Sequence, residues 1–387
     1  MKFAASSTVG AVIAAAAVSS SSVLSSHAAQ APTPTPLQER QLGALVGGLV
    51  ADAAVMPLHW IYNQSDLLFL GGAQPEFHDP PHCHDDRIVT HCDYDYPLGE
   101  NSPYGQQMRV YLQLFAKQGI KVGSVDASQL VQAYFGYYGN PAGACSNIST
   151  GLNSTGCYWD KCTKEFVANV RANASCVKDN ACGGDDNQAD ALAHQVITTI
   201  LGSGAAPEAT LSDASAIVTV TQQNEQAVAF GMAGARMLHS FLSGHSKTPR
   251  AAVTDTIAAL LDANRVLPNI EDFILAAGLQ FVVGEADEKS TAVTLQVGQS
   301  CDYPNNLLTG AHMLYQIGDG SGNATGNYVS AIRQLIQGGG DQASRSMFVG
   351  SFLGAVAGVD GIPQSWKDRY THYDEVLQLA KTVVGIE

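Results

Sequence analysis

Residues 338–366 read GGGDQASRSMFVGSFLGAVAGVDGIPQSW, three glycines and an aspartate followed by a nearly uncharged segment. The glycines allow the backbone to approach another group closely, and Asp341 lies where a helix would begin. A buried helix is predicted from there to Gly358, with Gly350 and Gly354 on the same face. Because glycine inside a helix costs about 1 kcal/mol relative to alanine, this repeat indicates that another backbone packs closely against that face.

Two other segments carry the same repeat of small residues, one centred on Gly47 and one on Gly231. Three such helices indicate a tightly packed helical core. Apolar residues at helical spacing predict further helices, whereas the alternating pattern of strands is scarce. We therefore predict an all-α fold, an orthogonal multi-helix bundle. The further helices are expected at residues 107–118, 126–138, 188–202, 211–221, 250–263, 269–283, 305–317, 327–337 and 371–384.

The first thirty residues have the pattern of a secretory signal peptide. Lys2 supplies a positive charge, residues 9–18 are apolar, and small residues around Ala28–Ala31 suit cleavage. A plastid or mitochondrial presequence is the alternative, but such peptides are rich in arginine, and the first arginine here is Arg40. Residues 1–30 are therefore excluded from the predicted fold.

Residues 31–37, APTPTPL, form a proline-rich leader that we expect to be free after cleavage, because proline cannot continue a helix. The ordered protein is expected to begin near Gln38. Residues 38–387 are treated as one domain, because no tandem repeat or domain linker interrupts them. The composition, 45% hydrophobic and 14% charged, suits a sizeable core.

The charge of the chain limits its partners. It carries 35 acidic and 20 basic side chains, a formal net charge of -15. Such a charge repels phosphate polymers and anionic lipid surfaces. No apolar run after the signal reaches the length needed to span a bilayer without polar or glycine interruption. We therefore expect no nucleic-acid partner and no membrane span after signal cleavage.

The cysteines and glycosylation triplets indicate an oxidising compartment. Eight cysteines, an even number, fit a protein with lasting disulfides. Five of them lie in residues 139–187, which we expect to be a disulfide-rich loop excursion. We therefore expect a glycoprotein that is secreted or lies in the endomembrane lumen. Acceptor triplets begin at Asn63, Asn147, Asn153, Asn173 and Asn323.

Residues 78–92, HDPPHCHDDRIVTHC, collect the side chains that bind zinc. Structural zinc sites usually bring ligands in close pairs such as C-x-x-C, and the chain contains no such pair. We favour a disulfide at Cys83 and Cys92, to each other or to other cysteines, with the histidines solvated. A zinc site remains the alternative. Nucleophilic catalysis has little support, because no G-x-S-x-G motif is present.

Residues 183–194, GGDDNQADALAH, place two adjacent carboxylates after two glycines and before an apolar helical face. One aspartate suffices to satisfy the free N–H groups of a helix start. The second, with Gln188, could hold a ribose hydroxyl or a cation, so Asp185 and Asp186 are equally open to a structural and a binding role. Asp341 with Ser344 cannot hold a hard cation alone, because such an ion needs several oxygens at once.

The segment GALVGGLVADAAVMPLHW resembles the opening motif of the ADP-ribosylglycohydrolases, G-x-x-x-G-D-A-x-G-x-P-x-E, with Asp52 and Pro57 in register. Residues 338–366 resemble the closing G-D-x-D-[ST] segment, small-residue helix and I-P-x-x-W of that family. The resemblance covers roughly residues 40 to 370 and is weakest across the cysteine-rich middle. Within the family, ADAAVMPLHWIY is most similar to the branch that includes the lens J-crystallins and selenoprotein J.

The resemblance implies an all-α fold with two magnesium ions in a central cleft. It implies hydrolysis of a glycosidic bond between ADP-ribose and a protein side chain or a small molecule, with the metal orienting the ribose and helping to activate water. Carried over by position, the catalytic residues are Asp52 and Asp341. The metal ligands are Asp52, His59, Asp341 and Ser344, and the substrate-binding residues are Asp185, Asp186, Gln188, Gly339 and Gly340.

The chain departs from the family pattern at three places. His59 stands where the family has an acidic residue, Ala343 replaces the second C-terminal aspartate, and the Thr-Asp-Asp cluster falls near NSPYGQQM, which has no carboxylate. We therefore expect one magnesium ion or none. Four interpretations stay open: slow hydrolysis with one weakly bound ion, a site rebuilt with Asp185, Asp186 or nearby histidines, binding of a nucleotide-ribose without turnover, and a crystallin-like structural protein.

Overall fold

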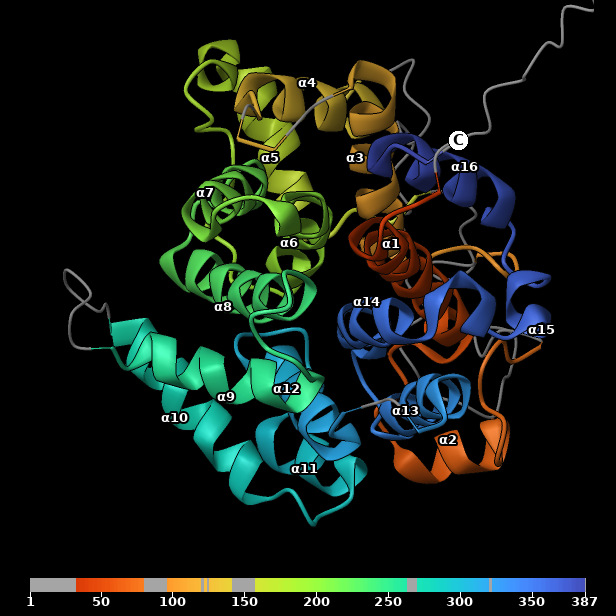
Figure 1. Ribbon diagram of the computed structural model, residues 1–387. Coiled ribbons are helices and arrows are strands. Elements are labelled where there is room, and N and C mark those ends of the chain that lie inside the picture. Colours follow the sequence, from red (N-terminus) through yellow and green to blue (C-terminus); the bar gives the residue numbers. More distant parts are fainter. Residues whose placement is uncertain are drawn as a thin grey trace, which may run out of the picture. The chain divides into compact units, whose positions relative to one another are not determined.

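The computed structural model describes residues 33–79, 96–119, 122–123, 125–140, 157–262, 270–319 and 322–386. In these residues the regular elements are sixteen α-helices and short 3-10 helices, which confirms the predicted all-α fold (Figure 1). The helices are α1 (Pro36–Val55), α2 (Gln64–Gly71), α3 (Pro103–Gln118), α4 (Ala127–Tyr138), α5 (Lys161–Ala172), α6 (Asp190–Leu201), α7 (Pro207–Val218), α8 (Glu225–Leu242), α9 (Pro249–Leu260), α10 (Ile270–Gly284), α11 (Ser290–Val297), α12 (Asn305–Ile317), α13 (Ala324–Gln337), α14 (Gln342–Gly361), α15 (Gln364–Lys367) and α16 (Tyr373–Val384).

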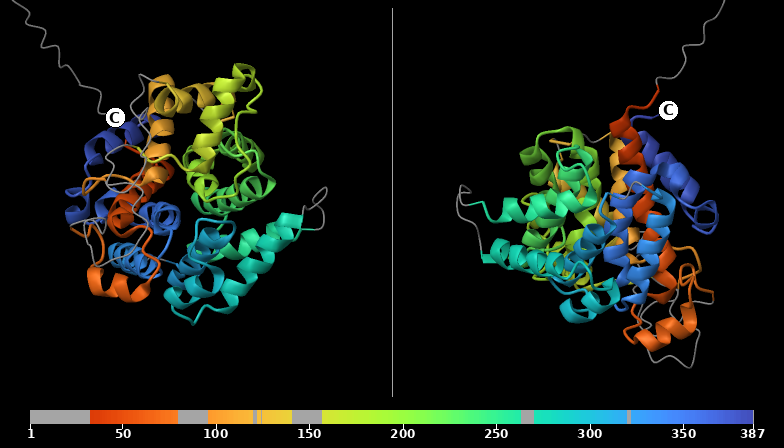
Figure 2. Two further views of the ribbon diagram at one scale, coloured as in Figure 1. Left: turned by 180° about the vertical axis from the view of Figure 1, so that it is seen from behind. Right: turned by 60° about the horizontal axis from the view of Figure 1, so that its bottom comes forward.

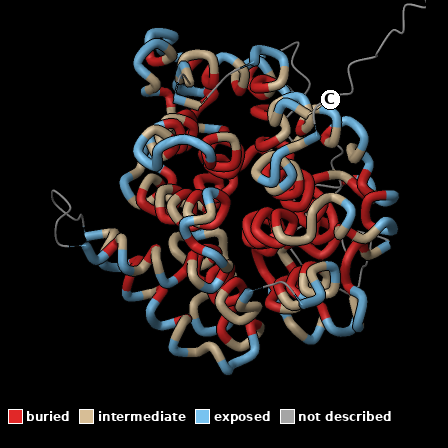
Figure 3. Tube along the Cα trace, in the orientation of Figure 1, coloured by how far each residue is buried: buried red, intermediate tan, exposed pale blue. Residues whose placement is uncertain are grey.

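Helices α1 and α14, from the two ends of the sequence, pack along each other at the centre of the core (Figure 2). The predicted small-residue faces meet here: a Cβ atom added to Gly47 would lie 2.7 Å from the carbonyl oxygen of Gly350. The hydroxyl of Tyr328 on α13 donates a hydrogen bond of 2.6 Å to the Gly47 carbonyl. Figure 3 shows the buried residues concentrated around these helices.

Helix α1 begins two residues earlier than the Gln38 start that we predicted. Thr35 and Gln38 form a capping box, and Pro36 occupies the first turn, where its missing N–H is not needed. The last two residues of the predicted leader therefore belong to the helix. Residues Pro36–Leu58 are long and apolar enough to cross a membrane. Within them, 94% of the most apolar 18-residue window is buried inside the protein, as expected of a core helix.

The segment predicted as a loop excursion contains helix α5. Asp160 caps this helix by accepting a 2.7 Å hydrogen bond from the Thr163 N–H, and one helical face is buried. Cys176 and Cys182 form a disulfide close behind it. The expectation of an irregular loop is thus corrected for residues 161–172. Helices α2, α11 and α15 were also missed; each has eight residues or fewer, which leaves little periodic signal.

Several predictions concern residues outside the described part of the chain. These are the signal peptide at residues 1–30, most of the cysteine- and histidine-rich stretch 78–92, and the acceptor residues Asn147 and Asn153. The other three acceptor asparagines are exposed, and the side chain of each accepts a hydrogen bond at the start of a helix. They are Asn63, Asn173 and Asn323.

Candidate functional site

The Asp341 carboxylate lies fully buried at the start of α14 and does not cap that helix. One oxygen, Oδ2, accepts hydrogen bonds from the Tyr104 hydroxyl at 3.2 Å and from the Ser344 hydroxyl at 2.8 Å. It also accepts one from the Asn306 amide. The other oxygen, Oδ1, lies 3.1 Å from Nε2 of His59. Asp341 therefore joins α14 to α3, to α12 and to the segment after α1.

His59 is held by Asp341 on one side and by a backbone N–H on the other. The N–H of Ala343 points to His59 Nδ1 at 3.4 Å, so Nδ1 accepts and Nε2 carries the proton. The imidazole stacks on Trp60, with ring centroids 5.1 Å apart. Two backbone hydrogen bonds fix this segment against the glycine turn: the Trp60 N–H donates to the Gly340 carbonyl at 3.0 Å, and the Gly340 N–H donates to the Ile61 carbonyl at 2.7 Å.

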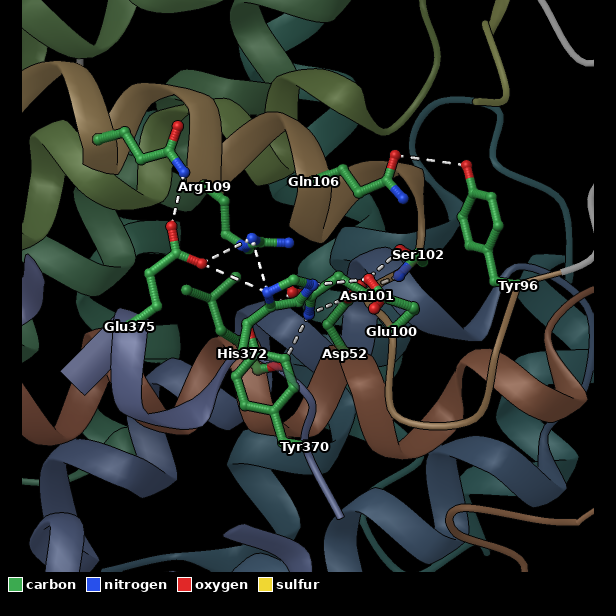
Figure 4. A network of polar contacts seen from close by, with 12 residues as sticks. Asp52, Tyr96, Glu100, Asn101, Ser102, Gln106, Arg109, Tyr370, His372 and Glu375 are labelled. Carbon is green, nitrogen blue, oxygen red and sulfur yellow. Dashed lines mark hydrogen bonds and ion pairs between the residues drawn. The ribbon is translucent and has the colours of Figure 1, made fainter. Parts of the chain in front are cut away.

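Asp52 on α1 is also fully buried and has its own set of donors. Its Oδ2 accepts hydrogen bonds from the Asn101 amide at 2.8 Å and from the Ser102 N–H at 2.9 Å. The Ser102 hydroxyl donates to Oδ1 at 2.5 Å. Figure 4 shows Asn101 between Asp52 and Tyr370, whose hydroxyl donates to the Asn101 side chain at 2.6 Å. This network ties the start of α3 to both ends of the chain.

The two buried carboxylates are electrostatically linked. Burial raises the pKa of Asp52 to about 6, and the negative charge of Asp341 adds to the rise, while hydrogen bonds from Ser102 and Asn101 oppose it. Burial likewise raises the pKa of Asp341 to about 6, against hydrogen bonds from its donors and the charge of Arg345. Arg345 itself is buried and donates to backbone carbonyls, including that of Leu335 at 2.9 Å.

A cleft of about 280 Å³ opens beside this network. His59 and Tyr104, which both contact Asp341, form part of its wall, whereas Asp52 and Asp341 lie behind the surface. Aromatic rings dominate the lining, with Trp60 and Tyr158 edge to face at 5.1 Å. The lining residues are His59, Trp60, Tyr62, Pro103, Tyr104, Tyr158, Asp160, Gln188 and Cys301.

Asp160 is the carboxylate that lines the cleft, and several donors hold it. Its Oδ1 accepts from the Thr163 N–H, and the Cys162 thiol lies 3.1 Å from the same atom. The Gln107 amide donates to Oδ2 at 2.5 Å. The amide oxygen of Gln107 lies 2.8 Å from His194 Nε2, and burial lowers the pKa of His194 to about 4, so that the imidazole is neutral and donates.

Asp190, in the first turn of α6, lies next to Asp160 in the interior. It is fully buried, and neither carboxylate oxygen has a hydrogen-bond donor among the described residues. Burial and the charge of Asp160 raise the pKa of Asp190 well above its usual range. Donor atoms of Asp160, Cys162 and Asp190 all lie within 4.8 Å of one another. The interior therefore holds a second acidic group beside the cleft, separate from Asp52 and Asp341.

A family model described as ADP-ribosylglycohydrolase matches residues 33–387. The chain belongs to the ADP-ribosylglycohydrolase family. Crystallin J1A of Tripedalia cystophora is 24% identical over 350 residues, covering 89% of this chain and 96% of that protein. Crystallin J1B of the same organism is 23% identical over 351 residues, covering 90% and 97%.

The solved structures show the same fold for this family member. A chain of an ADP-ribosylglycohydrolase-related protein complex superposes with a TM-score of 0.52 at 14% sequence identity. The match covers 91% of this chain and 99% of that chain. At this identity the likeness concerns the fold alone, while membership of the family follows from the sequence match.

Magnesium at the four positions carried over from the family does not fit the hydrogen bonds of this chain. The ion prefers six oxygen ligands in near-octahedral geometry. Here Oδ2 of Asp341 already accepts three hydrogen bonds, one of them from Ser344, while Oδ1 accepts none from the described residues and lies 3.1 Å from Nε2 of His59. Asp52 accepts three more. A cation would have to displace these donors.

The other predicted site residues lie in different surroundings. Gln188 lines the cleft, and Asp186 is buried with one oxygen that has no hydrogen-bond partner among the described residues. Asp185 is exposed and accepts a 2.6 Å hydrogen bond from Asn224. The two glycines at 339 and 340 adopt positive φ angles of 77° and 72° in a buried turn, and neither belongs to the cleft lining.

Asp185 and Asp186 do not open a helix, as we had expected. Helix α6 begins at Asp190, and isolated bridges at Gly184 and Gln188 precede it. Gly184 pairs there with the segment before α8 through a 2.8 Å hydrogen bond to the Thr221 carbonyl, and the Gln222 amide donates to the Asp186 carbonyl at 3.1 Å. This pairing places Asp186 and Gln188 near the cleft without helix capping.

Sequence reasoning missed most of the partners that complete these sites. Asn101 and Ser102 carry no motif, and Asn306 lies inside a helix without any local signal. Asp160 was hidden in the expected loop excursion, although its spacing to Thr163 is that of a helix cap. The sequence has no carboxylate near residue 104, and the structure leaves no room for one at residue 105. A Cβ on Gly105 would collide with the Asp52 carboxylate.

Proposed function

We propose that this protein hydrolyses the glycosidic bond between the ribose of an ADP-ribosyl group and a nitrogen or oxygen of a protein or small molecule. Family membership supports the substrate class. The observation that carries the proposal is the cleft itself, where the Asp160 carboxylate and the Asp341-backed imidazole of His59 lie among aromatic rings. Such rings suit stacking against a base or the apolar face of a sugar.

Asp160 is the group placed to handle the attacking water. A carboxylate within hydrogen-bond reach can take the proton of a water molecule as it attacks the anomeric carbon. The C–N or C–O bond then breaks, and the proton returns to the leaving atom, so that the products are free ADP-ribose and the unmodified acceptor. The Gln107 amide and the Thr163 N–H keep Asp160 in place for this step.

Asp52 and Asp341 act in this proposal as positioning residues. Asp341 orients His59 and Tyr104, which form the wall of the cleft, and Asp52 holds the two residues before α3. Gln188 presents an amide to the ribose hydroxyls from the segment before α6. These assignments predict a larger loss of rate from a change at Asp160 than from a change at Asp52.

The test is release of free ADP-ribose from two peptide classes, one modified on arginine nitrogen and one on serine oxygen, followed by chromatography. We expect the wild-type chain to release ADP-ribose, and Asp160→Asn to lower kcat by about 100-fold or more because it removes a general base. Binding of ADP-ribose, measured by calorimetry, should change little. Glu208→Gln, at an exposed acid on α7, is the matched control and should behave as wild type.

Binding of a nucleotide-ribose without turnover is the second candidate. It is favoured by the hydrogen bonds with which the chain itself occupies both oxygens of Asp52 and Oδ2 of Asp341. The same experiment separates the two functions. ADP-ribose binding with no release from either peptide would support this second function, and equal rates for wild type and Asp160→Asn would remove Asp160 from the mechanism.

A further inference from the structure

The acidic group beside the cleft is built from two separate segments. Asp160 and Cys162 lie at the start of α5, and Asp190 lies in the first turn of α6. All three side chains are buried, with exposed fractions of 6%, 0% and 0%. Their donor atoms are within 4.8 Å of one another, close enough that the three side chains could hold one ion.

Asp190 has no partner in the protein that explains its burial. Neither of its oxygens accepts a well-aligned hydrogen bond from the described residues. Its polar neighbours include the Asp160 carboxylate, which raises the pKa of Asp190, and the Gln107 side chain, which lowers it. Lys161 is 52% exposed and lies 3.9 Å from Asp186, and its ammonium group donates to the Asp185 carbonyl. Two adjacent buried carboxylates without a counter-charge are costly, so either a shared proton or a bound cation must balance them.

We propose that Asp160, Cys162 and Asp190 bind one divalent cation of the zinc type. A thiolate with two carboxylates is a donor set that zinc accepts, whereas magnesium selects oxygen alone. Thr163 and Gln107 donate hydrogen bonds to Asp160 and so hold one ligand in a fixed orientation. Three protein ligands leave one tetrahedral position open, as at zinc sites that bind water or substrate.

The site goes beyond the proposed function, because it concerns a cation that the family positions Asp52, His59, Asp341 and Ser344 do not provide for. It rests on that function in one respect, the nearness of the ion to the substrate. Because Asp160 also lines the cleft, the ion would lie at the margin of the substrate site. Binding of the cation is therefore tested without substrate.

The experiment uses cobalt, which replaces zinc and reports its ligands in the absorption spectrum. The full chain, with its disulfide intact, is stripped by a chelator, dialysed and titrated with Co²⁺. We expect one equivalent to bind and to produce a sulfur-to-cobalt charge-transfer band in the near ultraviolet. One equivalent of Zn²⁺ should displace the cobalt and abolish the band, whereas Mg²⁺ in large excess should leave it.

Two pairs of variants identify the ligands. Cys162→Ser should abolish the charge-transfer band, while Cys301→Ser, at the other free thiol among the described residues, which lines the cleft, should keep it. Asp190→Asn should weaken Zn²⁺ binding by at least about 100-fold. Loss of a group that only supports a ligand costs up to about 100-fold, and Asp190 is a ligand itself. Glu165→Gln, at a neighbouring exposed acid, should leave the affinity unchanged.

The outcomes decide between the ion and a proton shared by the two carboxylates. Failure of the wild-type chain to bind Co²⁺ or Zn²⁺, or an unchanged band in Cys162→Ser, would overturn the site. If Asp190→Asn does not fold, as judged by circular dichroism, the two cysteine variants still show whether Cys162 binds the cation. Loss of Co²⁺ binding in Cys162→Ser with intact release of ADP-ribose would support the site and leave the proposed hydrolysis standing.

Discussion

Asp52 and Asp341 are buried acids whose hydrogen-bond donors lower the cost of their charge without removing it. Each accepts three hydrogen bonds, yet burial still raises the pKa of each to about 6. A carboxyl whose pKa is higher in the folded than in the unfolded protein favours folding while it is protonated. That contribution is present at low pH and is lost as the pH rises through the folded value.

The first prediction follows for Asp52. Between about pH 4 and about pH 7, wild type should lose stability relative to Asp52→Asn by on the order of 1 to 3 kcal/mol, from a pKa raised from 3.8 to about 6. Asparagine can keep the contacts, because its oxygen can accept from Asn101 and the Ser102 N–H while its amide donates to the Ser102 hydroxyl. Urea denaturation across this pH range measures the difference.

The control for this prediction is Glu208→Gln, a change of the same kind at an exposed acid. It should leave the pH profile of the free energy of unfolding as in wild type. A profile of Asp52→Asn that runs parallel to wild type from about pH 4 to about pH 7 would show that the Asp52 carboxyl is not titrating in this range.

At the residue scale, the sequence allowed the two acids to be predicted but not their partners. Asp52 was identified by its charge on an apolar helix, and Asp341 by its place after three glycines; the structure buries both and links their charges. Asn101 and Asn306 reach them only through tertiary packing, which leaves no local pattern. Asp190 was missed for the same reason, because its neighbour Asp160 precedes another helix, α5.

At the element scale, the contact between α1 and α14 depends on the absence of side chains. A Cβ on Gly47 would meet the Gly350 carbonyl oxygen and the Gly354 Cα, both at 2.7 Å, and neither backbone atom can move without shifting a helix. Sequence periodicity predicted this close approach. It also predicted the bounds of α12 at residues 305–317, as observed, but not α5, whose helical period is embedded in a cysteine-rich segment.

The second prediction concerns Gly47→Ala. We expect it to lower the free energy of unfolding by about 1 to 3 kcal/mol, since overpacking outweighs the gain in helix propensity. Gly136→Ala on α4 is the matched control: the site is exposed, and an added Cβ meets nothing within 4 Å. It should stabilise by up to about 1 kcal/mol. Equal effects of the two changes in chemical denaturation would contradict the close packing of α1 against α14.

At the scale of the whole molecule, the cleft is assembled from segments spread along the sequence. Its lining comes from the residues after α1, the start of α3, the segment before α5, the segment before α6, and Cys301 before α12. The resemblance predicted that the chain ends would meet, and α1 and α14 do so. It could not predict Asp160, because the middle of the chain resembles the family least.

The last prediction concerns the compartment in which this molecule is made. We propose that it passes through the secretory pathway, and two structural facts support this: Cys176 and Cys182 form a disulfide, and the acceptor residues Asn63, Asn173 and Asn323 are exposed. Expressed in full length by a secreting eukaryotic cell, the protein should appear in the medium with its N-terminus between Ala28 and Ala31. Peptide-N-glycosidase should lower its mass, and Asn173→Gln should remove one glycan; Asn187→Gln, at an asparagine outside any acceptor triplet, should remove none. An intracellular, unglycosylated product that begins at Met1 would contradict the proposal.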